Sequence, residues 1–216
     1  MKCAGFELHT PRSNAKRPIV SFARRILIFG LVTIVSIAID QLTKVWATEA
    51  FKGKPTLTYL GDTFRFQYAT NEGAFLSLGG NLPPQVRFWL LTVGVGALLL
   101  AITVQAIRNP VSTANLTGYA LIVSGGFSNW IDRARFDGVV VDFMNMGLGS
   151  LRTGVFNVAD LAILAGIGVL LIAGAKHDRE LKRQAEAKKA LESTPTATQA
   201  GLSDPARASE TPRSDA

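Results

Sequence analysis

Two long stretches without a charged residue constrain this 216-residue chain more than any other feature. They cover residues 88–107 and 109–131, which is 20 and 23 residues. Because an α-helix rises about 1.5 Å per residue, each stretch is long enough to cross a hydrocarbon layer about 30 Å thick. Hydrophobic residues make up 48% of the chain and charged residues only 18%, which is typical of a membrane protein. We therefore predict an all-α membrane protein.

Two further predicted spans each contain an acid. Residues 26–39 are apolar, and extending them to a full span includes Asp40 and Lys44. Residues 155–175 form a span only by including Asp160. The first stretch follows two arginines, as a cleaved signal peptide does, but no small-residue A-x-A cleavage site comes after it. We expect it to be retained, which gives four transmembrane helices.

The predicted organisation is one membrane domain between two tails. Lys and Arg number 13 in residues 1–25, the turn at Arg108 and residues 176–189 taken together, and seven in the two other connecting segments. This excess predicts that both tails are cytoplasmic. The predicted parts are an N-terminal tail 1–25, a membrane domain 26–175 with helices at about 26–47, 86–107, 114–131 and 155–175, and a C-terminal tail 176–216. The C-terminal tail is predicted to begin as a charged helix and to be disordered from residue 192.

The segment between the first two predicted helices carries a strand pattern. Phe64, Phe66 and Tyr68 alternate with polar residues, which is the period of a strand with one apolar face. We predict a small extracytoplasmic β-sheet in this segment. A short interfacial helix is expected to follow at 74–78, ended by glycines and prolines.

Composition excludes several classes of site. Cys3 is the only cysteine, so neither an internal disulfide nor a multi-cysteine metal site can form. The two histidines, His9 and His177, lie in the polar tails, which leaves no Ser-His or Cys-His nucleophile. The net charge of +7 is not interleaved with aromatic residues as on a nucleic-acid-binding surface, and we attribute it to membrane topology. We predict no metal, no cofactor and no nucleic-acid partner.

Three acids fall on the predicted outer side of the membrane. Asp132 ends the third predicted span, and Asp142 and Asp160 are 18 residues apart with three glycines between them. An acid in or at a membrane is costly and is a functional candidate by default. We hypothesise that the loop folds Asp142 against the start of the fourth helix, where the two carboxylates share one proton as in an aspartic protease. The alternatives are that Asp142 pairs with Arg135 or Arg152, and that Asp160 is a helix N-terminal charge.

Five short motifs, interleaved with the four predicted spans, resemble one family in their order. They are Asp40-Gln41-Leu42-Thr43-Lys44, Asn71-Glu72-Gly73-Ala74-Phe75, Asn129-Trp130-Ile131-Asp132-Arg133, Val140-Val141-Asp142-Phe143 and Phe156-Asn157-Val158-Ala159-Asp160. Together they resemble the lipoprotein signal peptidases of bacteria, signal peptidase II, over about residues 40–175. One departure is Ser124-Gly125-Gly126-Phe127-Ser128, where the family commonly has Gly-Gly-Ala-x-Gly. The replacements are small apart from Phe127 at the variable position, so close helix packing is expected to persist.

The resemblance implies an aspartic endopeptidase that cleaves prolipoproteins just before a diacylglyceryl-modified cysteine, at the outer face of the bacterial cytoplasmic membrane. It implies that Asp142 and Asp160 are the catalytic acids. The positions implied to bind or orient the substrate and the carboxylates are Asn71, Asn129, Arg133 and Asn157. Membrane lipid is the expected surrounding, and a monomer is the expected state.

Three charged residues are expected to give structural support rather than chemistry: Asp40, Lys44 and Asp132. Asp40 and Lys44 are four residues apart on a predicted helix, so we predict that they pair with each other. Asp132 is predicted to pair with its neighbour Arg133 at the helix end.

Other functions stay open on residue types alone. A small proton-coupled transporter also uses intramembrane acids, although such sites lie near the midplane between repeats, and no repeat is visible in this sequence. Nothing in the sequence forbids a non-catalytic membrane adaptor. A different intramembrane aspartyl protease is disfavoured because the signature Gly-x-Gly-Asp is absent.

Overall fold

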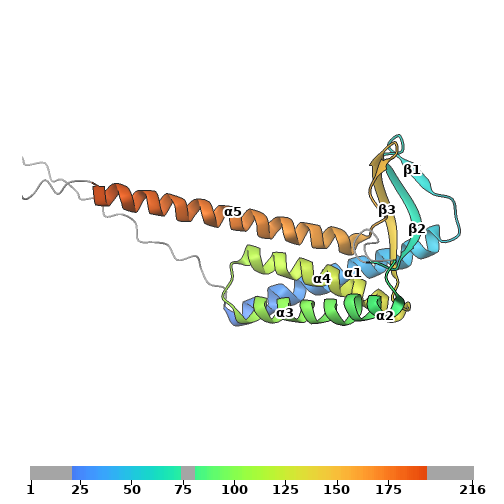
Figure 1. Ribbon diagram of the computed structural model, residues 1–216, viewed down its shortest axis with the longest axis horizontal. Coiled ribbons are helices and arrows are strands. Elements are labelled where there is room, and N and C mark those ends of the chain that lie inside the picture. Colours follow the sequence, from blue (N-terminus) through green and yellow to red (C-terminus); the bar gives the residue numbers. More distant parts are fainter. Residues whose placement is uncertain (1–20, 74–80, 194–216) are drawn as a thin grey trace, which may run out of the picture. The chain divides into compact units, whose positions relative to one another are not determined.

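The computed structural model describes residues 21–73 and 81–193, which are mostly helical (Figure 1). The helices are α1 (Phe22–Phe51), α2 (Pro84–Arg87), the π-helix η2 (Phe88–Gly94), α3 (Val95–Arg108), α4 (Thr113–Arg135) and α5 (Val158–Ser193). The predicted interfacial helix at 74–78 lies outside the described residues, as do most of the N-terminal tail and the tail beyond residue 193. Residues 192 and 193, predicted to be disordered, belong to α5.

Among the described residues, three helices are long and apolar enough to cross a membrane. They are Phe22–Phe51, Pro84–Arg108 and Val158–Ala190, of which the second combines α2, η2 and α3. They correspond to three of the four predicted spans. α4 occupies the position of the remaining predicted span. It has a lower apolar content, because it carries polar residues such as Ser124, Ser128 and Asn129, all of which are buried. Its composition alone does not confirm it as a span.

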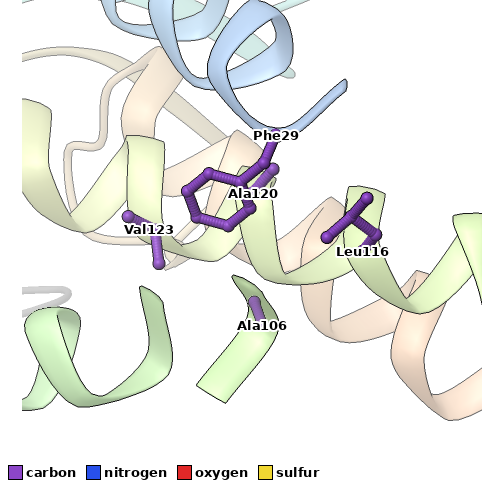
Figure 2. Packing of buried hydrophobic residues seen from close by; sticks show 5 residues of the cluster. All are labelled: Phe29, Ala106, Leu116, Ala120 and Val123. Atoms are coloured by element: carbon purple, nitrogen blue, oxygen red, sulfur yellow. The ribbon is translucent and has the colours of Figure 1, made fainter. Parts of the chain in front are cut away.

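The helix α4 packs against both α1 and α3. Phe29 of α1 and Ala106 of α3 form a buried cluster with Leu116, Ala120 and Val123 of α4 (Figure 2). The three α4 residues are three or four positions apart and therefore lie on one helix face. Lipid tails are as apolar as these side chains, so close van der Waals packing stabilises the contact rather than release of water. This packing fixes α4, and the polar residues at its end, relative to α1.

α4 and the first part of α5 approach each other at glycines. A Cβ atom on Gly125 would overlap the backbone carbonyl oxygen of Ala159, and one on Gly118 would lie 2.9 Å from the Leu170 side chain. Real Cβ atoms do not approach backbone oxygens so closely, whereas small residues allow such contacts between membrane helices. Because Ala159 lies in the first turn of α5, Gly125 determines how close the start of α5 lies to α4.

A four-stranded antiparallel sheet adjoins the helices, with its strands in the order β1-β2-β3-β4. The strands are β1 (Leu57–Tyr59), β2 (Phe64–Asn71), β3 (Val140–Leu148) and β4 (Leu151–Arg152). The strand predicted around Phe64 is confirmed as part of β2. The sheet nevertheless extends beyond the segment where it was predicted, because β3 and β4 come from the segment after α4. A two-stranded ribbon is marginally stable by itself, and β3 supplies the third strand that it needs.

A buried cluster joins the sheet to the end of α1. It consists of Ala47, Phe51, Phe143, Met144 and Phe156. The predicted apolar face of β2 is confirmed, since Phe64, Phe66 and Tyr68 pack partly buried against this cluster. The contact holds β3 beside the end of α1, where polar side chains of both elements meet.

The Gly125 contact predicts a specific loss of stability. Gly125→Ala places a methyl group against the Ala159 carbonyl, and overpacking of this kind costs about 1–3 kcal/mol. We expect a lower melting temperature for the purified protein in detergent. Gly168→Ala is the matched control in a membrane helix, because a Cβ there meets nothing within 4 Å and alanine is the better helix former. Equal melting temperatures for the two variants would contradict the proposed role of Gly125.

Candidate active site

Asp142 is buried in strand β3, where the strand pairing sets its neighbours. Asn71 of β2 pairs with Val140, and Ala69 pairs with Asp142. Alternate residues share one face of a strand, so Asn71 and Asp142 are diagonal neighbours on the same face. The Asn71 Nδ2 donates a hydrogen bond of 2.9 Å to the Asp142 Oδ2. The sequence position predicted to orient a carboxylate therefore contacts one directly.

Asp160 lies in the first turn of α5, where it takes part in a reciprocal cap. The backbone N–H of Asp160 donates to the Asn157 Oδ1 over 3.0 Å, and the backbone N–H of Asn157 donates to the Asp160 Oδ2 over 3.2 Å. This is a capping box, in which the residue before the helix and the third helical residue satisfy each other's backbone donors. Asp160 is thus a helix N-terminal charge, as in the alternative interpretation, and its other oxygen remains available for further contacts.

Asn157 brings the two candidate acids together. Its Nδ2 donates to the Asp142 Oδ1 over 2.6 Å, while its backbone N–H donates to Asp160. Asn157 is fully buried, with no exposed surface. One side chain and its own backbone therefore fasten the strand acid to the helix acid, although the two acids are 18 residues apart in the sequence.

Asn129 and Arg133, both on α4, differ in how they reach this site. The Asn129 Nδ2 donates to the Asp160 Oδ1 over 3.0 Å, and its Oδ1 accepts from the Asn157 Nδ2 over 3.0 Å. The Arg133 guanidinium instead donates to two backbone carbonyls, of Gly73 at 2.5 Å and of Asn129 at 3.4 Å. Of the four predicted orienting residues, Asn71, Asn129 and Asn157 hydrogen-bond to an aspartate, and Arg133 donates elsewhere.

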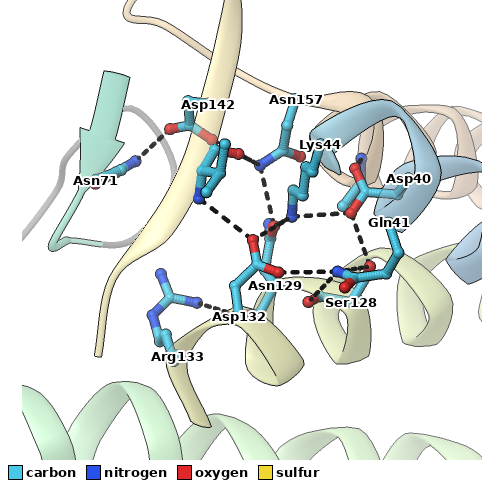
Figure 3. A network of polar contacts seen from close by, with 12 residues as sticks. Asp40, Gln41, Lys44, Asn71, Ser128, Asn129, Asp132, Arg133, Asp142 and Asn157 are labelled. Carbon is cyan, nitrogen blue, oxygen red and sulfur yellow. Dashed lines mark hydrogen bonds and ion pairs between the residues drawn. The ribbon is translucent and has the colours of Figure 1, made fainter. Parts of the chain in front are cut away.

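A buried ammonium group lies at the centre of the surrounding network (Figure 3). Lys44 is only 4% exposed, and its Nζ lies 2.8 Å from the Asp40 Oδ2, the Asp132 Oδ2 and the Asn129 Oδ1. An ammonium group has three donors and no acceptor, so these three contacts satisfy it completely. The predicted pair of Asp40 with Lys44 is confirmed. The predicted pair of Asp132 with Arg133 was wrong, because Asp132 points across to Lys44 of α1.

The two carboxylates bound to Lys44 each hold a backbone N–H. The Asp40 Oδ1 accepts from Ala159 over 2.7 Å, and the Asp132 Oδ2 accepts from Val141 over 3.2 Å. Ala159 immediately precedes Asp160, and Val141 immediately precedes Asp142. The charged cluster of Asp40, Lys44 and Asp132, hereafter the buried triad, thus holds the backbone beside both candidate acids.

Residues 32–176 match the family model described as signal peptidase (SPase) II. The chain belongs to the signal peptidase II family. The family consists of proteases, so this multi-pass membrane protein is a peptidase, which decides against the transporter and adaptor alternatives.

Several relatives are named lipoprotein signal peptidase. That of Trichormus variabilis is 37% identical over 147 residues, which cover 68% of this chain and 88% of the relative. That of Syntrophotalea carbinolica is 34% identical over 143 residues, or 66% of this chain and 88% of the relative. Two solved structures of bacterial membrane enzymes align with TM-scores of 0.59 and 0.58 at 21% and 23% identity, covering 70% and 68% of this chain and 89% and 92% of theirs. At this identity they show the shared fold alone.

Two residues of the peptidase network were missed by sequence reasoning. The Gln41 Nε2 donates to the Asp132 Oδ1 over 2.8 Å and to the Ser128 hydroxyl over 3.0 Å, and that hydroxyl donates to the Asp40 Oδ2 over 2.7 Å. The helical spacing carried a usable signal. Ser128 and Asp132 are four residues apart on α4, and Gln41 and Lys44 are three residues apart on α1. Each of these two pairs therefore lies on one helix face.

The environment of Asp142 alters its acidity. Burial disfavours the charged carboxylate and raises the pKa of Asp142 from 3.8 to about 7. The amide donors of Asn71 and Asn157 and the charge of Lys44 act in the opposite direction, whereas the charge of Asp160 adds to the rise. Burial is the largest of these effects, so in this peptidase Asp142 keeps its proton close to neutral pH.

The buried triad predicts a large effect of removing its cation. Lys44→Met leaves Asp40 and Asp132 buried without a counter-charge, which typically costs about 3–5 kcal/mol of stability. We expect a clearly lower melting temperature in detergent. Arg65→Met is the matched control, because it removes a cation from the half-exposed Asp62 and should lower the melting temperature much less than Lys44→Met. If Lys44→Met melts like Arg65→Met, the triad does not stabilise the fold.

Proposed function

We propose that this peptidase removes the signal peptide from prolipoproteins that carry a diacylglyceryl-modified cysteine, with Asp142 and Asp160 as its catalytic acids. The observation that carries the proposal is the position of Asn157, which hydrogen-bonds to both buried carboxylates. A pair of acids held in this way in a low dielectric shares a proton, because both cannot be charged at once. Membership of the signal peptidase II family and relatives named lipoprotein signal peptidase support the substrate class.

The proposed membrane arrangement has four spans, both termini in the cytoplasm and the acids at the outer side. The excess of Lys and Arg in the tails supports this orientation. α4 packs against α1 and α3, two parts of the molecule that are themselves apolar enough to span, which supports its role as the additional span. Asp160 in the first turn of α5 then lies where lipid meets the outer water, which is where a lipid-modified substrate and a hydrolytic water arrive together. A single copy of the chain contributes every group proposed here, and we propose that it acts as a monomer.

The proposed reaction follows from the different surroundings of the two acids. The carboxylate of Asp160 takes a proton from water as the water oxygen bonds to the peptide carbonyl carbon, while protonated Asp142 donates its proton to the carbonyl oxygen. In the second step Asp160 passes its proton to the amide nitrogen, Asp142 takes the hydroxyl proton back, and the C–N bond breaks. We assign the negative charge to Asp160, because it lies at a helix N-terminus that favours an anion. The shared proton then belongs to Asp142, whose pKa burial raises to about 7.

The remaining residues are proposed to position the substrate and the acids. Arg133 lines a cavity of about 360 Å³ together with Phe88 and Leu91, and its Nε is buried without a partner among the described residues. We propose that it receives a carbonyl oxygen of the bound substrate, for which a guanidinium is a suitable donor. The buried triad is proposed to support the site by holding the backbone beside each acid.

Substitution of either acid tests the chemistry. Asp142→Asn and Asp160→Asn are each expected to lower cleavage of a diacylglyceryl-modified precursor by at least about 10³-fold, because neither proton transfer can then be completed. Cleavage is measured in detergent on gels, with an unmodified precursor beside the modified one. Asp178→Asn is the control, because Asp178 is an exposed acid of α5 that lies 18 residues beyond Asp160 on the same helix.

Three results distinguish the parts of this proposal. Near-normal turnover by either aspartate variant rules out the two-acid mechanism. Equal cleavage of the modified and unmodified precursors rules out the lipid-modified substrate class. Loss of activity in Asp178→Asn would show that removal of an acid remote from the site also abolishes cleavage, and that the two named acids are not special.

The pKa of Asp142 predicts the dependence of activity on pH. Protonated Asp142 is the proposed proton donor, so kcat/KM should fall about tenfold per pH unit above roughly pH 7. The folded protein holds this proton more tightly than the unfolded chain, so the group makes folding less favourable as pH rises from about 4 to about 7. Melting temperatures recorded at each pH separate unfolding from loss of the proton. A rate that stays flat from pH 6 to pH 9 contradicts the assignment.

A further inference from the structure

Three leucines at the turns of the sheet are almost completely exposed. Leu60 is 82% exposed in the turn between β1 and β2, and Leu148 and Leu151 are 73% and 83% exposed on either side of the turn between β3 and β4. Single exposed leucines are ordinary, but a group of large ones on neighbouring turns marks an interaction surface. These three residues are called the leucine tip below.

The two turns are fastened to each other, which makes the leucine tip one surface. Gly147 donates its N–H to the carbonyl of Thr63 over 2.9 Å, and the Arg152 guanidinium donates to the carbonyl of Asp62 over 2.7 Å. The Asp62 carboxylate is paired with Arg65 at 2.5 Å and lies 3.6 Å from Arg152. Two cations therefore surround one acid, so the base of the leucine tip has a net positive charge.

Leu60 has an unfavourable backbone as well as an exposed side chain. Its φ is 55°, in the left-handed region that costs most residues about 1 kcal/mol or more and that glycine adopts without strain. The neighbouring Gly61 also has a positive φ, so the turn already contains one residue suited to it. Asp62 shares the positive φ as well, so the left-handed backbone belongs to the turn. The exposed leucine side chain at this position is what an apolar partner would contact.

The sheet places the leucine tip at the level of the membrane surface. In Figure 1 the strands lie at one end of the helices and run across the helix axes. Helices that span a bilayer lie roughly along its normal, so strands crossing them run roughly parallel to the surface. Trp46 near the outer end of α1 is half-exposed and contacts Phe66 of β2, which continues the apolar surface of a spanning helix into the sheet.

We propose that the leucine tip inserts into the outer leaflet of the membrane and holds the sheet at a fixed depth beside the bundle. Apolar side chains enter the interface, and the positive base of the tip faces anionic headgroups. This inference rests on the proposed orientation of the helices and not on the two-acid chemistry. It gives the sheet, which carries Asn71 and Asp142, an attachment to the membrane in addition to its contacts with the helices.

Fluorescent labels test the contact directly. Cys3→Ser removes the only cysteine, and Leu60→Cys, Leu148→Cys and Leu151→Cys are then each labelled with an environment-sensitive dye in the full chain. The protein is reconstituted in vesicles of phosphatidylglycerol and phosphatidylcholine, with or without nitroxide-bearing lipids. We expect blue-shifted emission that the nitroxide lipids quench at least twofold. Glu186→Cys is the control, because Glu186 is an exposed polar residue in the charged part of α5, 11 residues beyond the predicted span 155–175, and its label should stay in water.

Each outcome of the labelling decides the question. Emission like that of a dye in water at all three positions overturns the proposal. A blue shift that lipid nitroxides do not quench and that grows with protein concentration shows that a second copy of the chain covers the tip instead. Quenching in a protein that cleaves nothing supports the leucine tip and refutes the peptidase proposal, so failures of the two proposals are distinguishable.

Turnover measurements give a second readout. Joint replacement by Leu60→Ser, Leu148→Ser and Leu151→Ser should raise KM for a lipid-modified precursor in vesicles severalfold, with kcat unchanged, and should have no effect in detergent. Leu60→Gly guards against misfolding, because glycine relieves the left-handed strain and should not lower the melting temperature. The same KM for the triple variant and the unmodified peptidase in vesicles would overturn the functional part of the proposal.

Discussion

The whole site depends on one buried ammonium group with three acceptors. Lys44 lies within 2.8 Å of oxygens on Asp40, Asp132 and Asn129, which draws α1 and α4 together at a single point. Burying a charge is costly unless its partners and donors are all satisfied, and here each of the three donors has an acceptor. The two carboxylates then have lone pairs left for backbone N–H groups of β3 and α5. The contact between α1 and α4 thereby sets the positions of a strand and of a helix start.

Much of the helical fold could be predicted, because the length of an uncharged stretch is a local signal. The apolar face of β2 and the pairing of Asp40 with Lys44 also follow from spacing within one element. The partner of Asp132 could not be found in this way. A neighbouring Arg133 is the obvious local choice, whereas the contact with Lys44 depends on how two helices cross. The segment that forms β3 is likewise predicted as a loop from local signals. It becomes a strand through its pairing with β2.

The candidate site combines two backbone conformations that a single segment could not provide. A strand gives Asp142 a fixed diagonal neighbour in Asn71, and a helix start gives Asp160 a capping partner in Asn157. Asn157 connects the two because its side chain reaches the strand acid while its backbone serves the helix acid. The family match extends over this same region, and the terminal tails lie mostly beyond it.

The mixed origin of the sheet and of the network has a consequence for biosynthesis. The groups around the two acids come from α1, β2, α4, β3 and the first turn of α5, which is nearly the whole length from residue 40 to residue 160. A ribosome-bound chain that ends before α5 holds Lys44 and Asp132 but has no second acid. Under the proposed two-acid mechanism, hydrolytic competence arises in one late step, when α5 is complete, and every shorter nascent chain is inert.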